Sequence, residues 1–160
     1  MKGICGFCGH YDAPDTIRPA LESAIEQLIV NGQAKIFYVG NQGAYDRIVT
    51  SILQKLKRKY DEMQYYVVLA YMPGKKRTYA GSVPTLLPEG MELVPGRFAI
   101  ARRNRWIVEQ AAFMIAYVTQ DVGGAAQTLA YARQKGVKIL NLGKKQEQRP
   151  AFPVEVAQER

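Results

Sequence analysis

Three segments of the sequence place glycines next to side chains that bind anions or form hydrogen bonds. They are residues 8–12 (Cys-Gly-His-Tyr-Asp), 40–46 (Gly-Asn-Gln-Gly-Ala-Tyr-Asp) and 119–128 (Thr-Gln-Asp-Val-Gly-Gly-Ala-Ala-Gln-Thr). Glycine lets the backbone approach an anion closely, and the free amides at the start of a helix point towards it. The second and third segments could therefore hold a phosphate. Alternatively, their glycines only make tight turns between strands and helices.

Arg103 and His10 are the side chains best suited to bind such a ligand directly. An arginine supplies a planar, two-pronged positive charge, and a histidine at a strand end can donate a hydrogen bond, although it can also be structural. Trp106 either stacks on a base or is buried against the sheet. The predicted ligand-binding residues are Gly9, His10, Gly40, Asn41, Gln42, Gly43, Asp46, Arg103, Asn104, Gly123, Gly124, Ala125, Gln127 and Thr128.

The two cysteines do not indicate a metal site. Cys5 and Cys8 are three residues apart on a predicted strand, so their side chains point to opposite faces. A zinc site needs four ligands, and the chain holds two Cys and one His in total. We expect neither a metal nor a cofactor.

The elements that position these residues alternate between strands and helices, which is typical of an α/β domain with a parallel sheet. Short apolar runs predict five strands, at about 2–8, 36–40, 65–71, 112–118 and 137–141. Amphipathic stretches predict helices from a cap at Thr16 to Gly32, then over 44–60 and 102–110, and a fourth that starts after Gly123-Gly124 and ends at Gly136. In a doubly wound sheet the ligand crevice lies outside the carboxyl ends of the strands, where the strand order reverses. The glycine-containing segments follow three of these strands.

Composition supports one domain at 1–142 followed by a tail at 143–160. The chain of 160 residues has a net charge of +8, which favours anionic partners, although cations at 55–59 also suit the end of a predicted helix. The apolar runs are shorter than the ~20 residues that cross a bilayer, and the first residues do not resemble a signal peptide. We therefore expect a cytoplasmic protein with no membrane contact.

The ordered motifs resemble those of the SLOG superfamily, and more narrowly its small single-domain bacterial and phage branch. The resemblance covers about residues 2–142. It is carried by residues 7–10, 40–46, 103–108 and 123–132. It implies a Rossmann-like nucleotide-binding domain whose members sense nucleotide-derived ligands, hydrolyse nucleoside monophosphates or bind single-stranded DNA.

The enzymatic branch, the cytokinin-activating phosphoribohydrolases, pairs an arginine with a glutamate after its glycine-rich loop. By this resemblance Arg103 takes the arginine position, whereas the glutamate position falls on Ala130 or Tyr131 and the third glycine of the loop on Ala126. Glycosidic bond cleavage needs a carboxylate. The candidates that could replace the glutamate are Asp12, Asp46, Glu109 and Asp121. A helix-cap role for Asp46, and an ion pair between Glu109 and Arg105, are the structural alternatives.

Three functions follow from these patterns. The favoured one is binding of a nucleotide-derived small molecule, and the second is hydrolysis of a nucleoside monophosphate with Arg103 and either Asp46 or Glu109. The third is single-stranded DNA binding by a long segment, 73–98, that contains Lys75, Lys76, Arg77 and Tyr79. We also expect a homodimer or higher homo-oligomer, with a lid over its own site as the alternative use of the long segment.

Overall fold

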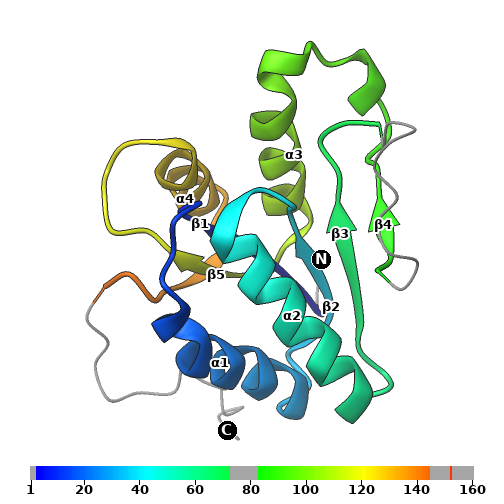
Figure 1. Ribbon diagram of the computed structural model, residues 1–160, viewed down its shortest axis with the longest axis vertical. Coiled ribbons are helices and arrows are strands. Elements are labelled where there is room, and N and C mark those ends of the chain that lie inside the picture. Colours follow the sequence, from blue (N-terminus) through cyan, green and yellow to red (C-terminus); the bar gives the residue numbers. More distant parts are fainter. Residues whose placement is uncertain (1–2, 73–82, 145–151, 153–160) are drawn as a thin grey trace, which may run out of the picture.

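Six parallel strands form one sheet in the computed structural model, which describes residues 3–72, 83–144 and 152 (Figure 1). The strands are β1 (Gly3–Gly9), β2 (Ala34–Val39), β3 (Gln64–Val68), β4 (Thr85–Leu86), β5 (Phe113–Tyr117) and β6 (Lys138–Asn141). The helices are α1 (Arg18–Val30), α2 (Gly43–Lys59), α3 (Gly96–Gln110) and α4 (Gly124–Gln134), with single 3₁₀ turns at Asp15–Ile17 and Met91–Leu93. The doubly wound α/β fold predicted from the sequence is confirmed.

The order of strands across the sheet is β4-β3-β2-β1-β5-β6. From β1 the chain moves outwards through β2 and β3 to β4, and α3 then carries it back to β5 on the other side of β1. The direction of winding therefore reverses between β1 and β5. This reversal is the position where a crevice is expected in such a sheet.

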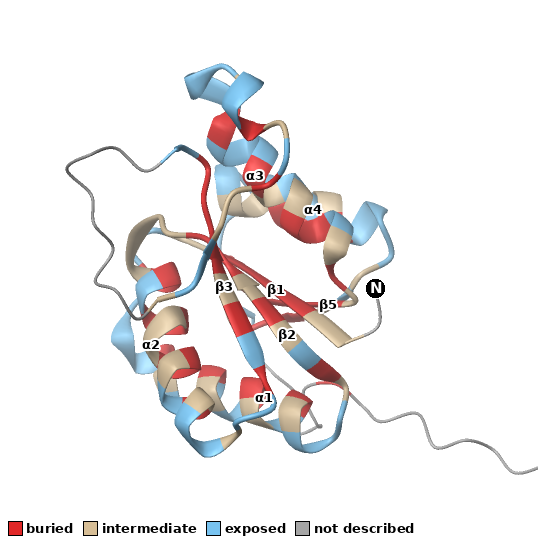
Figure 2. Ribbon diagram, turned by 90° about the vertical axis from the view of Figure 1, so that its right-hand side faces the viewer, coloured by how far each residue is buried: buried red, intermediate tan, exposed pale blue. Residues whose placement is uncertain are grey.

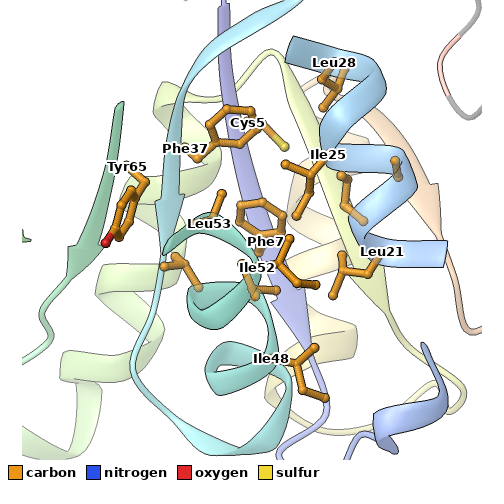
Figure 3. Packing of buried hydrophobic residues seen from close by; sticks show 14 of the residues in the cluster. Cys5, Phe7, Leu21, Ile25, Leu28, Phe37, Ile48, Ile52, Leu53 and Tyr65 are labelled. Atoms are coloured by element: carbon orange, nitrogen blue, oxygen red, sulfur yellow. The ribbon is translucent and has the colours of Figure 1, made fainter. Parts of the chain in front are cut away.

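The helices cover both faces of the sheet, α1 and α2 on one face and α3 and α4 on the other (Figure 2). The alternation of side chains along β1 explains this arrangement, because Phe7 packs in the cluster beneath α1 and α2 whereas Cys8 packs beneath α3 and α4. Figure 3 shows the first cluster, in which Phe7 and Phe37 lie against the apolar stripes of α1 and α2. Their ring centroids are 6.3 Å apart.

Three boundaries differ from the sequence prediction. The sequence predicts five strands, whereas the sheet has six. The additional strand, β4, was missed because it has only two residues, too short an apolar run to indicate a strand. Helix α3 begins at Gly96 rather than at residue 102, so it occupies part of the segment expected to be a loop. Thr16 is not the cap of α1; it lies in a 3₁₀ turn, and Ile17 stands at the cap position without a side-chain hydrogen bond.

The chain after β6 adds to the core beneath α1 and α2 through Leu142, which is partly buried against it, and Phe152. Phe152 is buried, and its ring packs edge-on against Phe113 with the centroids 5.2 Å apart. The rest of the segment expected as a tail lies outside the described residues beyond Lys144. Within the described ranges no helix is long and apolar enough to cross a membrane.

Candidate functional site

A cleft with a volume of about 540 Å³ opens at the carboxyl edge of the sheet, where the winding reverses. It contains ten of the predicted ligand-binding residues: Gly9, His10, Gly40, Gln42, Asp46, Arg103, Asn104, Gly123, Gly124 and Ala125. The segments after β1, β2 and β5 therefore meet in one site. Other residues that line it are Phe7, Cys8, Tyr11, Asp12, Ile100, Gln120 and Val122.

Gly9 ends β1 and leaves room for the ring of Tyr45. A Cβ at this position would overlap that ring, which is fully buried. The Tyr45 hydroxyl reaches across β1 and donates a hydrogen bond of 2.6 Å to the carbonyl of Ile115 on β5. This contact fixes the first turn of α2 against the strands that form the floor of the cleft.

Gly43 joins the loops after β1 and β2. Its φ of +87° suits glycine, and a Cβ there would lie 2.5 Å from the Cα of Tyr11. The neighbouring amide of Ala44 donates to the Tyr11 carbonyl at 2.6 Å. Gly43 therefore shapes one wall of the site from behind, and it does not line the cleft itself.

Arg103 is a buried cation at the site, with only 1% of its surface exposed. Its Nε donates to Asn104 Oδ1 at 2.8 Å, and its Nη1 donates to the Val68 carbonyl at 2.9 Å and to Asn41 Oδ1 at 3.2 Å. Asn41 does not line the cleft, so its role here is to orient the guanidinium. Arg103 and Asn104, both predicted to bind the ligand, are thus in direct contact with each other on α3.

Asp46 approaches the same point from the first turn of α2. Its Oδ2 accepts the amide of Gln42 at 2.9 Å, which is the cap-like role considered for it. Burial raises the pKa of Asp46 to about 6, although the Gln42 hydrogen bond and the charge of Arg103 both act to lower it. A Cβ on Gly40 would lie 2.8 Å from Asp46 Oδ2 and 2.9 Å from Arg103 Cζ, so Gly40 allows the two charged groups to meet.

The chain that leaves β5 holds the His10 ring in place. The amide of Thr119 donates to His10 Nε2 at 2.9 Å, and the imidazole stands edge-on to the Tyr117 ring at 6.0 Å. Because Nε2 accepts this bond, the ring proton of the neutral imidazole is on Nδ1. His10 is among the residues that line the cleft.

The N-terminus of α4 forms the wall opposite α2. Gly123 precedes the helix with φ +101°, and both Gly123 and Gly124 are exposed. A Cβ at either glycine would meet no other atom within 4 Å, so no neighbouring group crowds this turn. No acidic residue lies in the first turn of α4, which leaves the positive end of the helix dipole uncompensated there.

A second hollow of about 710 Å³, here called the α3–α4 groove, lies between these two helices. It is lined from α3 by Arg97, Ala101, Arg102 and Arg105, and from α4 by Tyr131. Gln127 and Thr128, which were predicted to bind the ligand in the cleft, line this groove instead. The Thr128 hydroxyl donates to the Gly124 carbonyl at 2.9 Å, inside its own helix.

Several other candidates lie away from the cleft. Glu109 is exposed near the end of α3, and it makes no ion pair with Arg105, whose guanidinium lies 5.0 Å from the centroid of the Tyr131 ring. Trp106 is half-buried against Tyr38 of the sheet, with the ring centroids 5.2 Å apart. The basic residues at 75–77 and Tyr79 fall outside the described residues.

The cysteines point to opposite faces of the sheet, as the alternation of β1 requires, and both thiols are free and buried. Burial, reinforced by nearby Asp46, raises the pKa of Cys8 to about 12, so this thiol at the cleft floor is protonated at neutral pH. Among the described residues no group of three His, Cys, Asp or Glu side chains is placed to hold a metal ion.

One residue that lines the cleft and one that supports it were not found from the sequence. Ile100 entered no prediction because α3 was expected to begin two residues later, although the spacing of Ala99, Arg103 and Ile107 is helical. Asn141 at the end of β6 holds the chain where it leaves β5, since its Oδ1 accepts the Val118 amide at 3.0 Å and its Nδ2 donates to the Val118 carbonyl at 3.0 Å. A polar residue ending an apolar strand was the available signal.

The fold and the position of the cleft define a Rossmann-like α/β domain with its site at the reversal of the sheet. The chain is similar to the X-ray structure of DNA processing protein A (DprA) from Streptococcus pneumoniae, with a TM-score of 0.62 and 14% sequence identity. The match covers 86% of this chain and 49% of the DprA chain, so this chain spans about half the length of that protein. No family model and no curated protein matches the sequence.

Proposed function

We propose that the cleft binds a nucleotide or a nucleotide-derived metabolite through its phosphate. The observation that carries this proposal is the open N-terminus of α4, where Gly123 and Gly124 face free space in the same cleft as Arg103. Helix N-termini bind anions through their unsatisfied amides and their dipole. A phosphate seated there would also lie in a cleft with the N–H donor of His10.

The structural similarity to DprA supports the Rossmann-like fold that the resemblance to the SLOG superfamily implies. As part of this proposal, we place the chain in that superfamily. The comparison with DprA concerns the Rossmann-like fold, and the identity of 14% carries no ligand with it. The specific argument for a phosphate therefore comes from the residues of the cleft.

The test is a substitution of Gly124 by Ala, with Gly96→Ala as the matched control. Both glycines are the first residue of a helix, and a Cβ at either meets no atom within 4 Å. Neither change should unfold the protein, but the new methyl group at 124 projects into the space proposed for the phosphate. We expect Gly124→Ala to weaken binding of AMP, GMP or ADP-ribose at least tenfold by calorimetry, and Gly96→Ala to change it less than twofold. Absence of binding in a thermal-shift screen of these nucleotides and cyclic dinucleotides would refute the proposal.

A second candidate function is hydrolysis of a nucleoside 5′-monophosphate to base and ribose phosphate. The observation that favours it is the placement of Asp46, a buried carboxylate with a pKa of about 6, in the same cleft as Arg103. A carboxylate can stabilise the oxocarbenium-like transition state or activate water. Release of free base from AMP or GMP, abolished in Asp46→Asn, would establish this activity. Glu109, the other carboxylate considered, does not line the cleft.

Single-stranded DNA binding remains a third proposal, supported by the net charge of +8. Its predicted basic segment at 75–79 lies outside the described residues. DNA binding through lysines and arginines weakens steeply with salt. An affinity for a deoxyadenylate octamer that is unchanged between 50 and 200 mM salt would exclude it, because counterion release predicts a loss of roughly 300-fold over this range when about six phosphates of a single strand are contacted.

We also propose that the chain forms a homo-oligomer. Large apolar side chains are exposed around the cleft, among them Tyr11 at 77% and Val122 at 73% exposure. Such residues are typical of contact surfaces when they lie together. Sedimentation at micromolar concentration tests this proposal, and a monomer in the presence and absence of nucleotide would contradict it.

A further inference from the structure

The α3–α4 groove is continuous with the nucleotide cleft. Ile100, Asn104 and Gly124 line both hollows, so the proposed phosphate position at the start of α4 lies at their junction. Each hollow has a volume within the ~300–1,000 Å³ that is typical of small-molecule sites. A ligand longer than one nucleotide could therefore pass from one into the other without leaving the surface.

The charge of the groove is entirely positive in the described part of the chain. Arg97, Arg102 and Arg105 line it, and no Asp or Glu is among its described lining residues. Arg97, Ala101 and Arg105 recur every fourth residue, which places them on one face of α3. Ala101 stands between the two arginines of this row, and its short side chain leaves space between their longer ones.

Aromatic and apolar groups accompany this charge. The guanidinium of Arg105 lies over the Tyr131 ring at 5.0 Å, and that of Arg97 lies over the Phe98 ring at 4.7 Å. Phe98 is 51% exposed and Leu93 is 82% exposed, both on the lip of the groove. Arginines next to exposed flat or apolar surfaces suit a ligand that joins a phosphate to a base, because the base stacks while the phosphate pairs with the cation.

We infer that the α3–α4 groove binds a second, phosphate-linked nucleoside of the same ligand. This inference rests on the proposed function, since the first phosphate is placed at Gly123 and Gly124. The ligand class it names is a dinucleotide, whether a free dinucleotide or one end of a single-stranded oligonucleotide. Arg102 and Arg105 contact the linking or second phosphate, and the apolar lip formed by Leu93 and Phe98 receives the second base.

The experiment compares three probes by calorimetry: 5′-dAMP, the dinucleotide 5′-pdApdA and a deoxyadenylate octamer. The wild-type protein should bind pdApdA about tenfold more tightly than dAMP, which is the effect expected of one or two added charged hydrogen bonds. The double variant Arg102→Ala/Arg105→Ala should lose that advantage and keep its affinity for dAMP within twofold. Ala101→Phe, which fills the groove without removing charge, should have the same effect.

The control is Arg58→Ala, which removes an exposed arginine in the last turn of α2 and should leave all three affinities unchanged.

The octamer identifies the source of the dinucleotide. If the octamer binds no more tightly than pdApdA, the ligand is a free dinucleotide. If it binds more tightly and with a dependence on salt, the ligand is a nucleic-acid strand, and either result supports the groove. Equal affinities for dAMP and pdApdA would overturn the inference while leaving the cleft proposal intact. If hexaglutamate binds through Arg102 and Arg105, and pdApdA binds no more tightly than dAMP, the dinucleotide inference would be overturned in favour of an acidic protein partner. Loss of all nucleotide binding in the wild type would overturn both proposals.

Discussion

The two faces of the sheet carry their charges in different ways. On the α1–α2 face, lysines of α2 pair with glutamates of α1, Lys55 with Glu22 at 2.9 Å and Lys59 with Glu26 at 3.1 Å. On the α3–α4 face, the described residues form no such ion pair between the helices, and the exposed arginines of α3 line a groove instead. On the first face, charged side chains of the two helices pair with each other. The second keeps positive charge available for a ligand.

The apolar layers follow the same division. The cluster beneath α1 and α2 is the larger one and contains the stacked rings of Phe7 and Phe37 (Figure 3). The cluster beneath α3 and α4 is smaller and is bordered by half-buried aromatics such as Trp106 and Tyr131. We expect the α1–α2 face to supply more of the stability, whereas the proposed groove lies on the α3–α4 face.

The largest expected effect comes from making the same deletion on each face. Leu53→Ala on α2 and Leu129→Ala on α4 both truncate a leucine that is at most 2% exposed. Such changes lower the free energy of unfolding by about 2–5 kcal/mol. We expect Leu53→Ala to fall near the upper limit and Leu129→Ala near the lower, because Leu129 borders a surface hollow and its surroundings can relax. Urea denaturation measures both, and equal losses would contradict the comparison.

The next effect concerns Asp46, whose carboxyl lies in the cleft at the start of α2. Because burial raises its pKa to about 6 from an ordinary value of 3.8, the folded protein binds this proton more tightly than the unfolded chain does. Stability therefore falls as the pH rises between about 4 and 6. Asp46→Asn should remove this decline. Its free energy of unfolding should therefore rise, relative to that of the wild type, by on the order of 3 kcal/mol between about pH 4 and pH 6. Parallel stability curves for the two proteins from pH 4 to 7 would show that Asp46 does not titrate in this way.

Adjacent arginines on α3 should differ in their effect on stability. Arg103 is 1% exposed and donates to the Val68 carbonyl, whereas Arg102 is exposed in the α3–α4 groove. Arg103→Ala should cost about 1.5–3 kcal/mol, the usual value of hydrogen bonds to a charged group. Arg102→Ala should change the unfolding free energy by less than about 0.5 kcal/mol. A similar cost for both in thermal or urea unfolding would mean that Arg103 is not a structural anchor.

The fold and the location of the cleft could be predicted from the sequence because they depend on local patterns. Apolar runs separated by amphipathic stretches imply a doubly wound sheet, and such a sheet places its crevice after the predicted strand ends at Cys8, Gly40 and Val118. The division of roles among the glycines could not be predicted. Gly9 accommodates Tyr45 and Gly43 accommodates Tyr11, contacts between segments far apart in the chain, whereas Gly124 faces open space. The groove likewise depends on α3 beginning at Gly96, because Arg97, Phe98 and Ile100 line it.

The smallest expected effect tests whether the ion pairs of the α1–α2 face are more than a coincidence of position. Glu22 is 31% exposed and Lys55 is 66% exposed, so water screens their attraction. Glu22→Gln should therefore lower the unfolding free energy by about 0.2–1 kcal/mol at low salt, and by less at high salt. On the other face, Arg105→Ala should lower the unfolding free energy by no more than Glu22→Gln does, because it breaks no ion pair. The same substitution should weaken dinucleotide binding about tenfold. A double-mutant cycle of Glu22→Gln with Lys55→Met isolates the pair. If the cycle gives no coupling energy at low salt, the ion pairs do not stabilise the α1–α2 face, and its stability comes from its apolar core alone.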